Sequence, residues 1–241
     1  MRIIVLVDAD SLIFASCYKN KEEKKIYPYY ETLEECQLKF DQSFMSIVNY
    51  LEETFEIQKL RVFSGRSKNN FRKLLCKTYK ANRTNVEKPP MLDQMHEYVK
   101  TQYEAISSCG HETDDAVAKY WYESQKIVGK DNVIIVSIDK DYRQFPALIY
   151  NYHIKHKKIE KITEQQALYN FYEQMIIGDT ADNVNYFYGF GKKFAEKYLK
   201  DCTSKYQYVK KVYKLFRDRY RQKGKEKYIE CYNLLKVRTD V

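Results

Sequence analysis

Long apolar runs, zinc-type cysteine spacings and histidine-based catalytic patterns are all missing from the 241-residue sequence. The apolar stretch in MRIIVLVD is too short to cross a bilayer and no signal-peptide cleavage site follows it, so we expect a buried strand in a cytoplasmic protein without a membrane anchor. The six cysteines have no CxxC or Cys/His spacing, which favours reduced thiols over disulfides or a zinc cluster. The histidines also lack the spacing of a metal site or triad: His96, His111, His153 and His156.

Positive charge is what the sequence has in excess. Forty-two Lys and Arg residues stand against 33 Asp and Glu, a net charge of +9. Such a field attracts nucleic acid or an anionic membrane surface. The 24 tyrosines and 12 phenylalanines could stack on bases, but packing in cores and on amphipathic faces is the favoured interpretation.

Short apolar runs at 3–7, 60–63, 132–138 and 147–152 alternate with helical patterns. This alternation predicts an α/β fold with a mostly parallel central sheet and helices on both faces. Between the first two runs, residues 31–56 repeat apolar positions at helical spacing and predict a long amphipathic helix.

A second part of the chain is predicted to be wholly helical. Residues 64–110 form a basic, polar connection that passes through two prolines into a helical pattern. Beyond residue 163, no strand pattern appears and every segment has helical spacing. We therefore expect an α/β domain over 1–165, which includes the 64–110 region, and a helical subdomain over 166–241.

Nine carboxylates are grouped at four places: Asp8 and Asp10; Glu112, Asp114 and Asp115; Asp139 and Asp141; Asp179 and Asp182. The first and third groups follow predicted strands, so they should share the carboxyl edge of the sheet, where sites form in open α/β folds. Converging carboxylates repel one another unless hard divalent cations such as Mg²⁺ or Mn²⁺ neutralise them. The alternative for each group is local: a helix start with Thr113 as N-cap, a cap near Ser11, or a turn.

Five motifs in order resemble the flap endonuclease and 5′-3′ exonuclease family, particularly its bacteriophage members and the 5′-nuclease domains of bacterial DNA polymerases. They are LVDADSLIF, FRKLLCKTYKANR, ETDDAVA, VIIVSIDKDYRQF and GDTADNVNYFYGFGKKFAEKYL. The resemblance spans nearly the whole chain. It implies a PIN-like 5′-nuclease fold with a helical arch and a helix-three-turn-helix element at about 179–200.

The resemblance also implies a metal-ligand set. A first ion would be held by Asp8, Glu112, Asp114 and Asp115, and a second, more loosely held ion by Asp139, Asp141, Asp179 and Asp182. One Mg²⁺ would activate the attacking water and the other would stabilise the leaving oxygen, with Mn²⁺ as a substitute. The catalytic residues would be Asp8, Asp114, Asp139, Lys80 and Arg83.

DNA contacts are implied by two of the motifs. Lys80 and Arg83 would contact the scissile phosphate at the base of an arch formed by residues 84–110, with Arg72 nearby, although charge runs are usually solvated faces. Tyr79 would stack on a terminal base or pack in a core. In the helix-three-turn-helix, Gly189 and Gly191 would admit a phosphate close to backbone N–H groups, Lys192 and Lys193 would add charge, and K⁺ would bind there.

Ser64 is a departure from the family pattern, because an acid usually follows the second strand. One expected metal-site carboxylate is therefore missing, and Asp10 is a candidate replacement. The sequence accordingly predicts a monomeric, metal-dependent 5′-nuclease that acts on DNA at a 5′ flap, nick or recessed duplex, with RNA–DNA hybrid as a second substrate. The alternatives are a haloacid-dehalogenase-like phosphatase, suggested by VDADS and GDTAD, and a DNA-binding relative that has lost cleavage.

Overall fold

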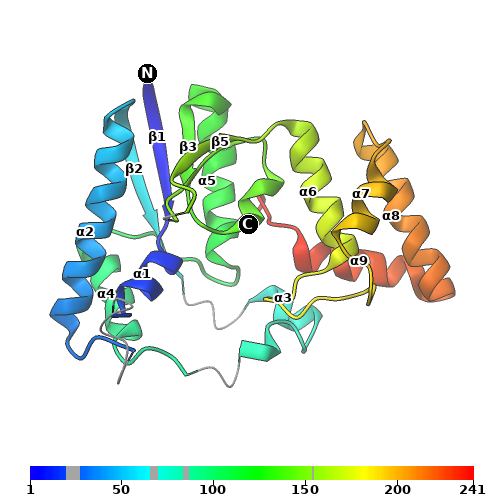
Figure 1. The fold of residues 1–241 in the computed structure, drawn as a ribbon, viewed down its shortest axis with the longest axis horizontal. Coiled ribbons are helices and arrows are strands. Elements are labelled where there is room, and N and C mark those ends of the chain that lie inside the picture. Colours follow the sequence, from blue (N-terminus) through cyan, green and yellow to red (C-terminus); the bar gives the residue numbers. More distant parts are fainter. Residues whose placement is uncertain (20–27, 66–69, 84–86, 154) are drawn as a thin grey trace.

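A five-stranded sheet organises the computed structural model, which describes residues 1–19, 28–65, 70–83, 87–153 and 155–241 (Figure 1). The strands are β1 (Arg2–Asp8), β2 (Glu56–Phe63), β3 (Val133–Val136), β4 (Leu148–Asn151) and β5 (Lys158–Lys161), in the order β2-β1-β3-β4-β5. The first four are mutually parallel and β5 pairs antiparallel with β4. The predicted α/β class and mostly parallel sheet are confirmed.

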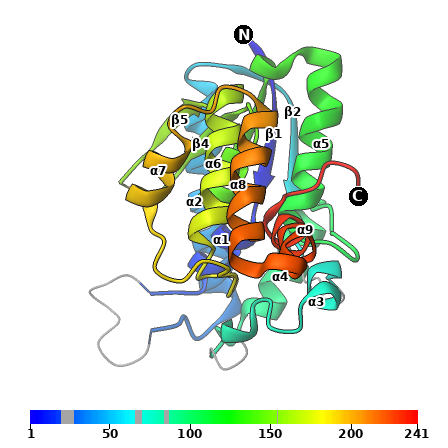
Figure 2. The ribbon, with the colours of Figure 1, turned by 90° about the vertical axis from the view of Figure 1, so that its right-hand side faces the viewer.

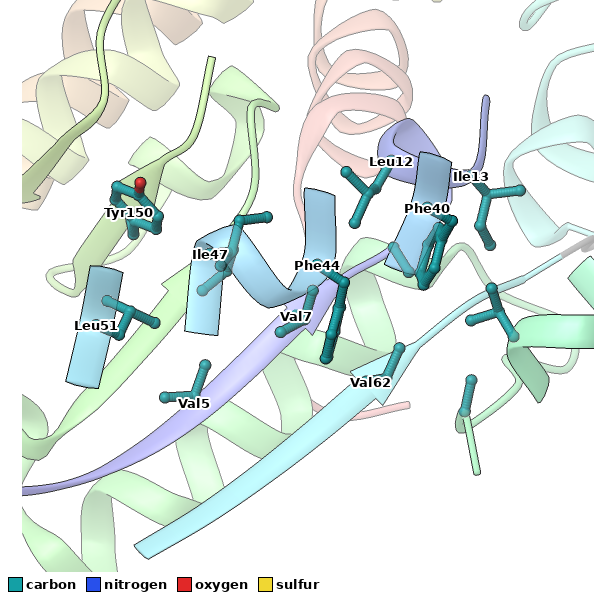
Figure 3. Close-up of a cluster of buried hydrophobic side chains, with 14 of the residues drawn as sticks. Val5, Val7, Leu12, Ile13, Phe40, Phe44, Ile47, Leu51, Val62 and Tyr150 are labelled. Atoms are coloured by element: carbon teal, nitrogen blue, oxygen red, sulfur yellow. The ribbon is translucent and has the colours of Figure 1, made fainter. Parts of the chain in front are cut away.

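The two faces of the sheet carry different helices. Alternate residues of β1 point to opposite faces, as the two-residue period of a strand requires. One face packs against α1 (Asp10–Ser16), α2 (Leu33–Glu52) and α4 (Leu92–Gln102), and Figure 3 shows Val7 of β1 beside Phe44 of α2 and Val5 below Ile47. The other face packs against α5 (Thr113–Val128). Both faces of the sheet are therefore covered, as the continuous apolar sequence of β1 predicts.

Helices α6 (Glu164–Ile177), α7 (Lys192–Leu199), α8 (Lys205–Tyr220) and α9 (Gly224–Leu235) form a third apolar cluster beside the sheet (Figure 2). Ala167 of α6 packs instead in the cluster of α5, while the other buried apolar residues of α6 belong to the third cluster. The helix that begins at the proposed boundary thus contributes to both parts, and the division at 165/166 stays a prediction.

The 64–110 region contains α3 (Phe71–Leu75), a 3₁₀ helix at Ala81–Arg83 and α4. Met95 and Val99 of α4 are buried in the core against α2, so this part of the proposed arch region is anchored on the α/β domain. Residues 66–69 and 84–86 lie outside the described residues, and the arch stays a prediction.

Several boundaries differ from the sequence-based expectation. The helical pattern predicted over 31–56 ends at Glu52, because β2 begins at Glu56, and Thr32 starts the helix with a capping box to Glu35. Strand β5 was not predicted, because its residues KIEK are mostly polar and lie at the sheet edge. Short 3₁₀ helices occupy Lys130–Asn132, Lys140–Gln144 and Arg221–Lys223. Within the described ranges, no helix combines the length and apolarity needed to span a bilayer.

Candidate active site

Three acid-bearing segments meet around the hydroxyl of Tyr142. This hydroxyl donates a hydrogen bond of 2.8 Å to Oδ2 of Asp8, the last residue of β1. Burial, followed by the charges of Asp8, Asp114 and Asp139, raises the pKa of Tyr142 well above its usual value. The acids predicted to share the carboxyl edge of the sheet therefore do come within electrostatic range of one another.

Five of these carboxylates have no ion pair with a lysine or arginine among the described residues, and we call them the unpaired group: Asp8, Asp10, Asp114, Asp139 and Asp141. Burial, and then the charges of Asp10 and Asp139, raise the pKa of Asp8 to about 8. Burial and the neighbouring Asp139 raise the pKa of Asp141 to about 7. The pKa of Asp114 is also raised, by burial first and then by Asp115 and Glu112. Acidic side chains are thus concentrated here without an ion pair to any lysine or arginine of the described residues.

Asp10 joins the ends of three elements. Its Oδ1 accepts a hydrogen bond from the backbone N–H of Gly65 (3.0 Å), and its Oδ2 accepts one from the hydroxyl of Thr113 (2.6 Å). A Cβ on Gly65 would lie 2.5 Å from that hydroxyl oxygen, so a side chain does not fit there. The prediction of Thr113 as the N-cap is wrong, because Glu112 is the N-cap of α5 and the Thr113 hydroxyl donates to Asp10.

The position where the family pattern calls for an acid holds a hydroxyl bonded to an imidazole. Ser64 Oγ lies 2.7 Å from Nδ1 of His96, which belongs to α4. Burial raises the pKa of Asp10, and a hydrogen bond from Ser64 and the charge of His96 are among the influences that lower it. His96, which the sequence left without a role, is therefore part of this edge.

The other four carboxylates form a paired group, because each is bound to a lysine or arginine. Glu112 pairs with Lys80, Asp115 with Arg72, Asp179 with Lys140, and Asp182 with Arg83 and Lys80. In every one of these pairs the partners lie at least 32 residues apart in sequence, so the sequence alone could not show which acids are compensated. The paired and unpaired groups alternate along the chain and touch at α5.

Arg72 and Asp115 pair with each other in this structure, and the phosphate contact of Arg72 and the metal-ligand role of Asp115 stay predictions. The side chain of Arg72 is 1% exposed and donates to both oxygens of Asp115, at 2.6 and 2.8 Å. Asp115, itself fully buried, also accepts hydrogen bonds from the backbone N–H groups of Glu112 and Arg238. A bidentate pair of this kind leaves neither side chain free for a ligand.

Tyr79 packs in the third cluster with 2% of its surface exposed, so the predicted stacking on a terminal base is wrong and the packing alternative holds. Its hydroxyl lies 2.8 Å from Oε2 of Glu112 and 2.8 Å from Oδ2 of Asp182. Burial and these two acids raise its pKa, so the hydroxyl stays protonated and bridges two members of the paired group.

Lys80 and Arg83 are held by the loop that follows α6. The backbone N–H of Lys80 donates to the carbonyl of Asp182 (2.9 Å), and Arg83 donates to Oδ1 of Asp182 (2.8 Å) and to the carbonyl of Ala181 (3.0 Å). Lys80 has φ +55° and Asn183 has φ +57°. Residues other than glycine rarely adopt this left-handed backbone conformation, which costs of order 1 kcal/mol or more at each position. The Lys80 side chain is 19% exposed and that of Arg83 54%, so Arg83 reaches solvent further.

Two residues without a sequence signal connect the acid-bearing loops. Nε2 of the buried Gln174 donates to Oδ1 of Asp141 (2.8 Å) and to Oδ2 of Asp179 (3.0 Å). Burial opposes ionisation of Asp179, but its hydrogen bond and ion pair with Lys140 outweigh burial and lower its pKa. Only the tertiary arrangement reveals that Gln174 and Lys140 belong to the site.

The chemistry of the unpaired group suits a hard cation, since every ligand atom that it offers is a carboxylate oxygen. Over the described parts of the chain, no three acidic, histidine or cysteine side chains converge closely enough to hold one ion directly. The four-carboxylate first set predicted from the sequence stays a prediction, and in this structure two of its members, Glu112 and Asp115, are bound to Lys80 and Arg72.

The predicted duplex-binding turn precedes α7. Gly189 has φ +87° and Gly191 is the N-cap of α7, and the space where a Cβ would stand is open at both. Rings of Phe187, Phe190, Phe194 and Tyr198 stack in succession along the turn and helix, with centroids 5.6, 4.1 and 5.6 Å apart. Lys192 and Lys193 lie exposed in the first turn of α7.

Comparison with known proteins places this architecture in a family. Residues 3–176 match the model of the 5′-3′ exonuclease N-terminal resolvase-like domain. The 5′-3′ exonuclease of Buchnera aphidicola is 30% identical over 182 residues, which cover 70% of this chain and 60% of the relative. The chain thus spans less than two-thirds of that relative's length.

Solved structures with the same fold come from bacteriophage T5. A T5 5′-exonuclease with bound zinc ions superposes with a TM-score of 0.64 at 17% identity, covering 98% of this chain and 89% of the phage chain. A T5 flap endonuclease in a complex with DNA and metal ions gives a TM-score of 0.60 at 14% identity, covering 98% and 99%. The family match, the ordered motifs and this fold together establish that the chain belongs to the flap endonuclease and 5′-3′ exonuclease family.

Proposed function

We propose that this protein is a metal-dependent 5′-nuclease that hydrolyses DNA phosphodiesters at 5′ ends, flaps or junctions between single-stranded and duplex DNA. The observation that carries the proposal is the unpaired group of carboxylates, of which Asp8 is buried, beside the Lys80–Glu112 ion pair at the carboxyl edge of the sheet. Phosphodiester cleavage needs that combination, because metal-binding carboxylates and cationic side chains must act on one phosphate. The family's name and the metal ions and DNA in the T5 complex support it.

Mg²⁺, with Mn²⁺ as a substitute, fits the unpaired group. Mg²⁺ keeps several waters and is usually bound by one or two carboxylates together with substrate phosphates, so a direct set of three protein ligands is not required. Asp8, Asp114, Asp139 and Asp141 would hold two ions in this way, and the raised pKa values of Asp8, Asp114 and Asp141 reflect a negative charge that a divalent cation would relieve. When bound, the ions supply Lewis-acid polarisation of the phosphate and lower the pKa of water.

Glu112, Asp179 and Asp182 take a different part in the proposal. Each neutralises a cationic side chain in this structure, and each would become available to a metal only if that side chain turned to the substrate. A phosphate that binds Lys80 or Arg83 would compete with Asp182 and Glu112 for them. The scissile phosphate would then receive the two positive charges, which counter the negative charge that develops in the transition state.

Duplex DNA would lie against the turn at Gly189 and Gly191. Both positions are open, so a phosphate can approach the backbone, and Lys192 and Lys193 add long-range attraction. K⁺ at this turn stays a prediction, which thermal unfolding in KCl against NaCl at equal ionic strength tests. The arch at 84–110, a monomeric state and a cytoplasmic location belong to the same proposal.

The phosphatase alternative has lost its support. Its late acidic loop should follow a buried strand, whereas Asp179 follows α6, and its second loop acid, Asp10, has both oxygens bonded to Gly65 and Thr113. The test of the proposal is cleavage of 5′-labelled flap, nicked and single-stranded DNA with Mg²⁺, Mn²⁺ or EDTA. We expect metal-dependent products from the 5′ end and no hydrolysis of p-nitrophenyl phosphate. Binding of flap DNA without cleavage at any metal concentration would instead support the relative that has lost catalysis.

A further inference from the structure

Five successive residues, Leu234–Arg238, attach the end of α9 and the chain beyond it to buried side chains of the acidic edge. On one side lies Arg72, whose Nε donates to the carbonyl of Leu234 (3.1 Å) and whose Nη2 donates to that of Lys236 (2.8 Å). The N–H of Arg238 donates to Oδ1 of Asp115 (2.7 Å). This side of the segment thus fixes the Arg72–Asp115 pair in the first turn of α5.

On the other side lies Gln144, at the end of the 3₁₀ helix that carries Asp141. Its Nε2 donates to the carbonyl of Leu235 (2.8 Å), and its Oε1 accepts from the N–H of Val237 (3.2 Å). The same Nε2 lies 3.1 Å from Oε1 of Gln174. Residues of the segment therefore alternate between the two sides. Residues 234, 236 and 238 bond to the Arg72–Asp115 pair, and residues 235 and 237 bond to Gln144 of the 3₁₀ helix.

Each side is connected to an unpaired carboxylate by a further hydrogen bond, which Asp115 donates on one side and Gln174 on the other. Asp115 is the neighbour of Asp114, and its backbone N–H donates to Oδ1 of Asp114 at 2.8 Å. Gln174, which accepts the hydrogen bond from Gln144, donates to Asp141 at 2.8 Å. The segment thus bridges the two carboxylate-bearing segments whose acids face each other.

Buried side chains hold the segment in one place, so it can fix the positions of the residues that it contacts. Val237 is buried in the cluster of α5 and β3, whereas Leu234 and Leu235 are buried in the cluster of α6–α9. The ammonium of Lys236 lies over the rings of Phe145 and Phe171, at 5.2 and 5.0 Å, and burial lowers its pKa to about 8. A shift of the segment would expose apolar side chains and leave buried polar groups without partners, both of which cost free energy.

We propose that Leu234–Arg238 is a positioning segment of the nuclease site, which sets the separation between the acids at the start of α5 and those of the 3₁₀ helix Lys140–Gln144. Its residues act through Arg72, Asp115, Gln144 and Gln174 and need no contact with the substrate. This inference rests on the proposed nuclease function. It assigns a catalytic consequence to groups that the family motifs would place at the DNA or the metal, or leave unassigned.

The first test compares two glutamine substitutions. Gln144→Met keeps the length of the side chain but removes its bonds to the segment and to Gln174. Gln165→Met is the control, because Gln165 donates to the carbonyl of Cys202 (2.6 Å) and lies 2.9 Å from the Tyr208 hydroxyl, which links α6 to α8 away from the acids. Single-turnover cleavage at saturating DNA, DNA affinity in Ca²⁺ and the Mg²⁺ concentration for half-maximal rate are measured where circular dichroism shows both variants folded.

We expect Gln144→Met to lower the single-turnover rate and raise the Mg²⁺ requirement by about 10- to 100-fold, the range for groups that orient metal ligands, with DNA affinity within about twofold of wild type. Gln165→Met should keep the wild-type rate. An unchanged rate in Gln144→Met, or an equal loss in both variants, overturns the proposal. If the wild-type protein itself cleaves no DNA, the proposed function fails, and the second test below still decides on the segment.

The second test needs no activity, because it measures amide hydrogen exchange at the two ends of the bridge. Arg72→Lys weakens the end at α5, and we expect faster exchange not only at Ala116 but also at Asp141, which Arg72 does not contact. Gln144→Met should likewise speed exchange at Ala116, on the far side of the segment. Variants that accelerate exchange only at their own end show that the two acid-bearing segments are independent, which overturns the inference.

Discussion

The paired and unpaired carboxylates of the active-site edge have similar sequence surroundings but opposite physical situations. Asp114 and Asp115 are adjacent, yet Asp115 forms a bidentate ion pair with Arg72 whereas Asp114 faces other acids. In the paired group, charge is compensated inside the chain and holds distant segments together. In the unpaired group, charge is left for something outside the chain, so the first group should govern stability and the second should govern cleavage.

The largest effects are expected when Asp114 and Asp115 are neutralised one at a time, which tests the contrast between the two groups directly. Asp114→Asn should lower the single-turnover cleavage rate by at least about 10³-fold while leaving DNA affinity equal or tighter, since one ligand and one repulsive charge are lost together. Asp115→Asn should instead destabilise the protein by about 3–5 kcal/mol, because the Arg72 guanidinium would stay buried without its counter-ion. Cleavage kinetics and urea unfolding of both variants supply the measurement.

Asp114→Asn should not be less stable than wild type in EDTA, because removing it relieves repulsion with Asp115 and Glu112. A large stability loss in Asp114→Asn with full stability in Asp115→Asn would reverse the roles of the two groups.

A second test asks whether a cation of the paired group also serves catalysis. Lys80→Ala should lower the single-turnover rate by about 10²-fold, because a donor to the developing phosphate charge is lost, with only a small effect on duplex binding. Lys130→Ala is a suitable control, since Lys130 forms an exposed pair with Glu164 away from the edge. A wild-type rate in Lys80→Ala would make Lys80 a purely structural partner of Glu112.

The pH dependence of stability sharpens the contrast, because the pKa of Asp8 in the unpaired group is raised and that of Asp179 in the paired group is lowered. The folded protein keeps the Asp8 proton up to about pH 8, whereas the unfolded chain releases it near pH 4. Metal-free stability should therefore fall as pH rises from about 4 to 8, and Asp8→Asn should flatten that decline. Asp179, whose pKa Lys140 lowers against the effect of burial, contributes stability at neutral pH that is lost in acid below its usual pKa of about 4.

Thermal unfolding in EDTA between about pH 3 and about pH 9 measures both trends, because this range extends about one unit below the usual carboxylate pKa and one unit above the raised pKa of Asp8. We expect a gain of several degrees for Asp8→Asn at the alkaline end only, of the size that roughly 1 kcal/mol produces in a chain of this length. Asp179→Asn should lose stability at neutral pH. A uniform shift at all pH values in Asp8→Asn would mean that its charge does not titrate with folding.

The smallest expected effect concerns the position where the family acid is missing. Ser64→Asp should lower the Mg²⁺ concentration for half-maximal rate by a few-fold, up to about tenfold, by adding a ligand oxygen to the unpaired group. Asp10→Asn should raise it, if Asp10 supplies the missing oxygen, and would also weaken the bonds to Gly65 and Thr113. Metal titrations that leave both variants at the wild-type requirement would place positions 10 and 64 outside the metal shell.

Much of the fold could be predicted from local patterns in the sequence. The apolar runs that became β1, β3 and β4 are short, continuous and bounded by polar residues, and the helical spacing of α2 and α6–α9 is regular. The grouping of acids after β1 and β3 followed from the rule for parallel sheets. β5 escaped notice because an edge strand with a polar face offers no apolar alternation to detect.

The roles of individual site residues were harder to predict, because they depend on partners far away in the chain. Arg72 and Asp115 are separated by 43 residues, and Arg72 also binds the carbonyl of Leu234 across 162 residues. A motif shows that both residue types are present but not that they neutralise each other. Tyr79 was ambiguous for the same reason, since its burial depends on the helices that follow β5.

The two outer strands of the sheet have a consequence for the protein in concentrated solution. A sheet edge presents unpaired backbone groups that invite another molecule to add a strand. At one edge β5 has Lys158, Glu160 and Lys161, and at the other β2 has Glu56, Lys59 and Arg61. Charged side chains at both edges make strand addition between copies unfavourable, so the sheet is protected against edge-to-edge aggregation although its interior parallel strands β1, β3 and β4 are strongly apolar.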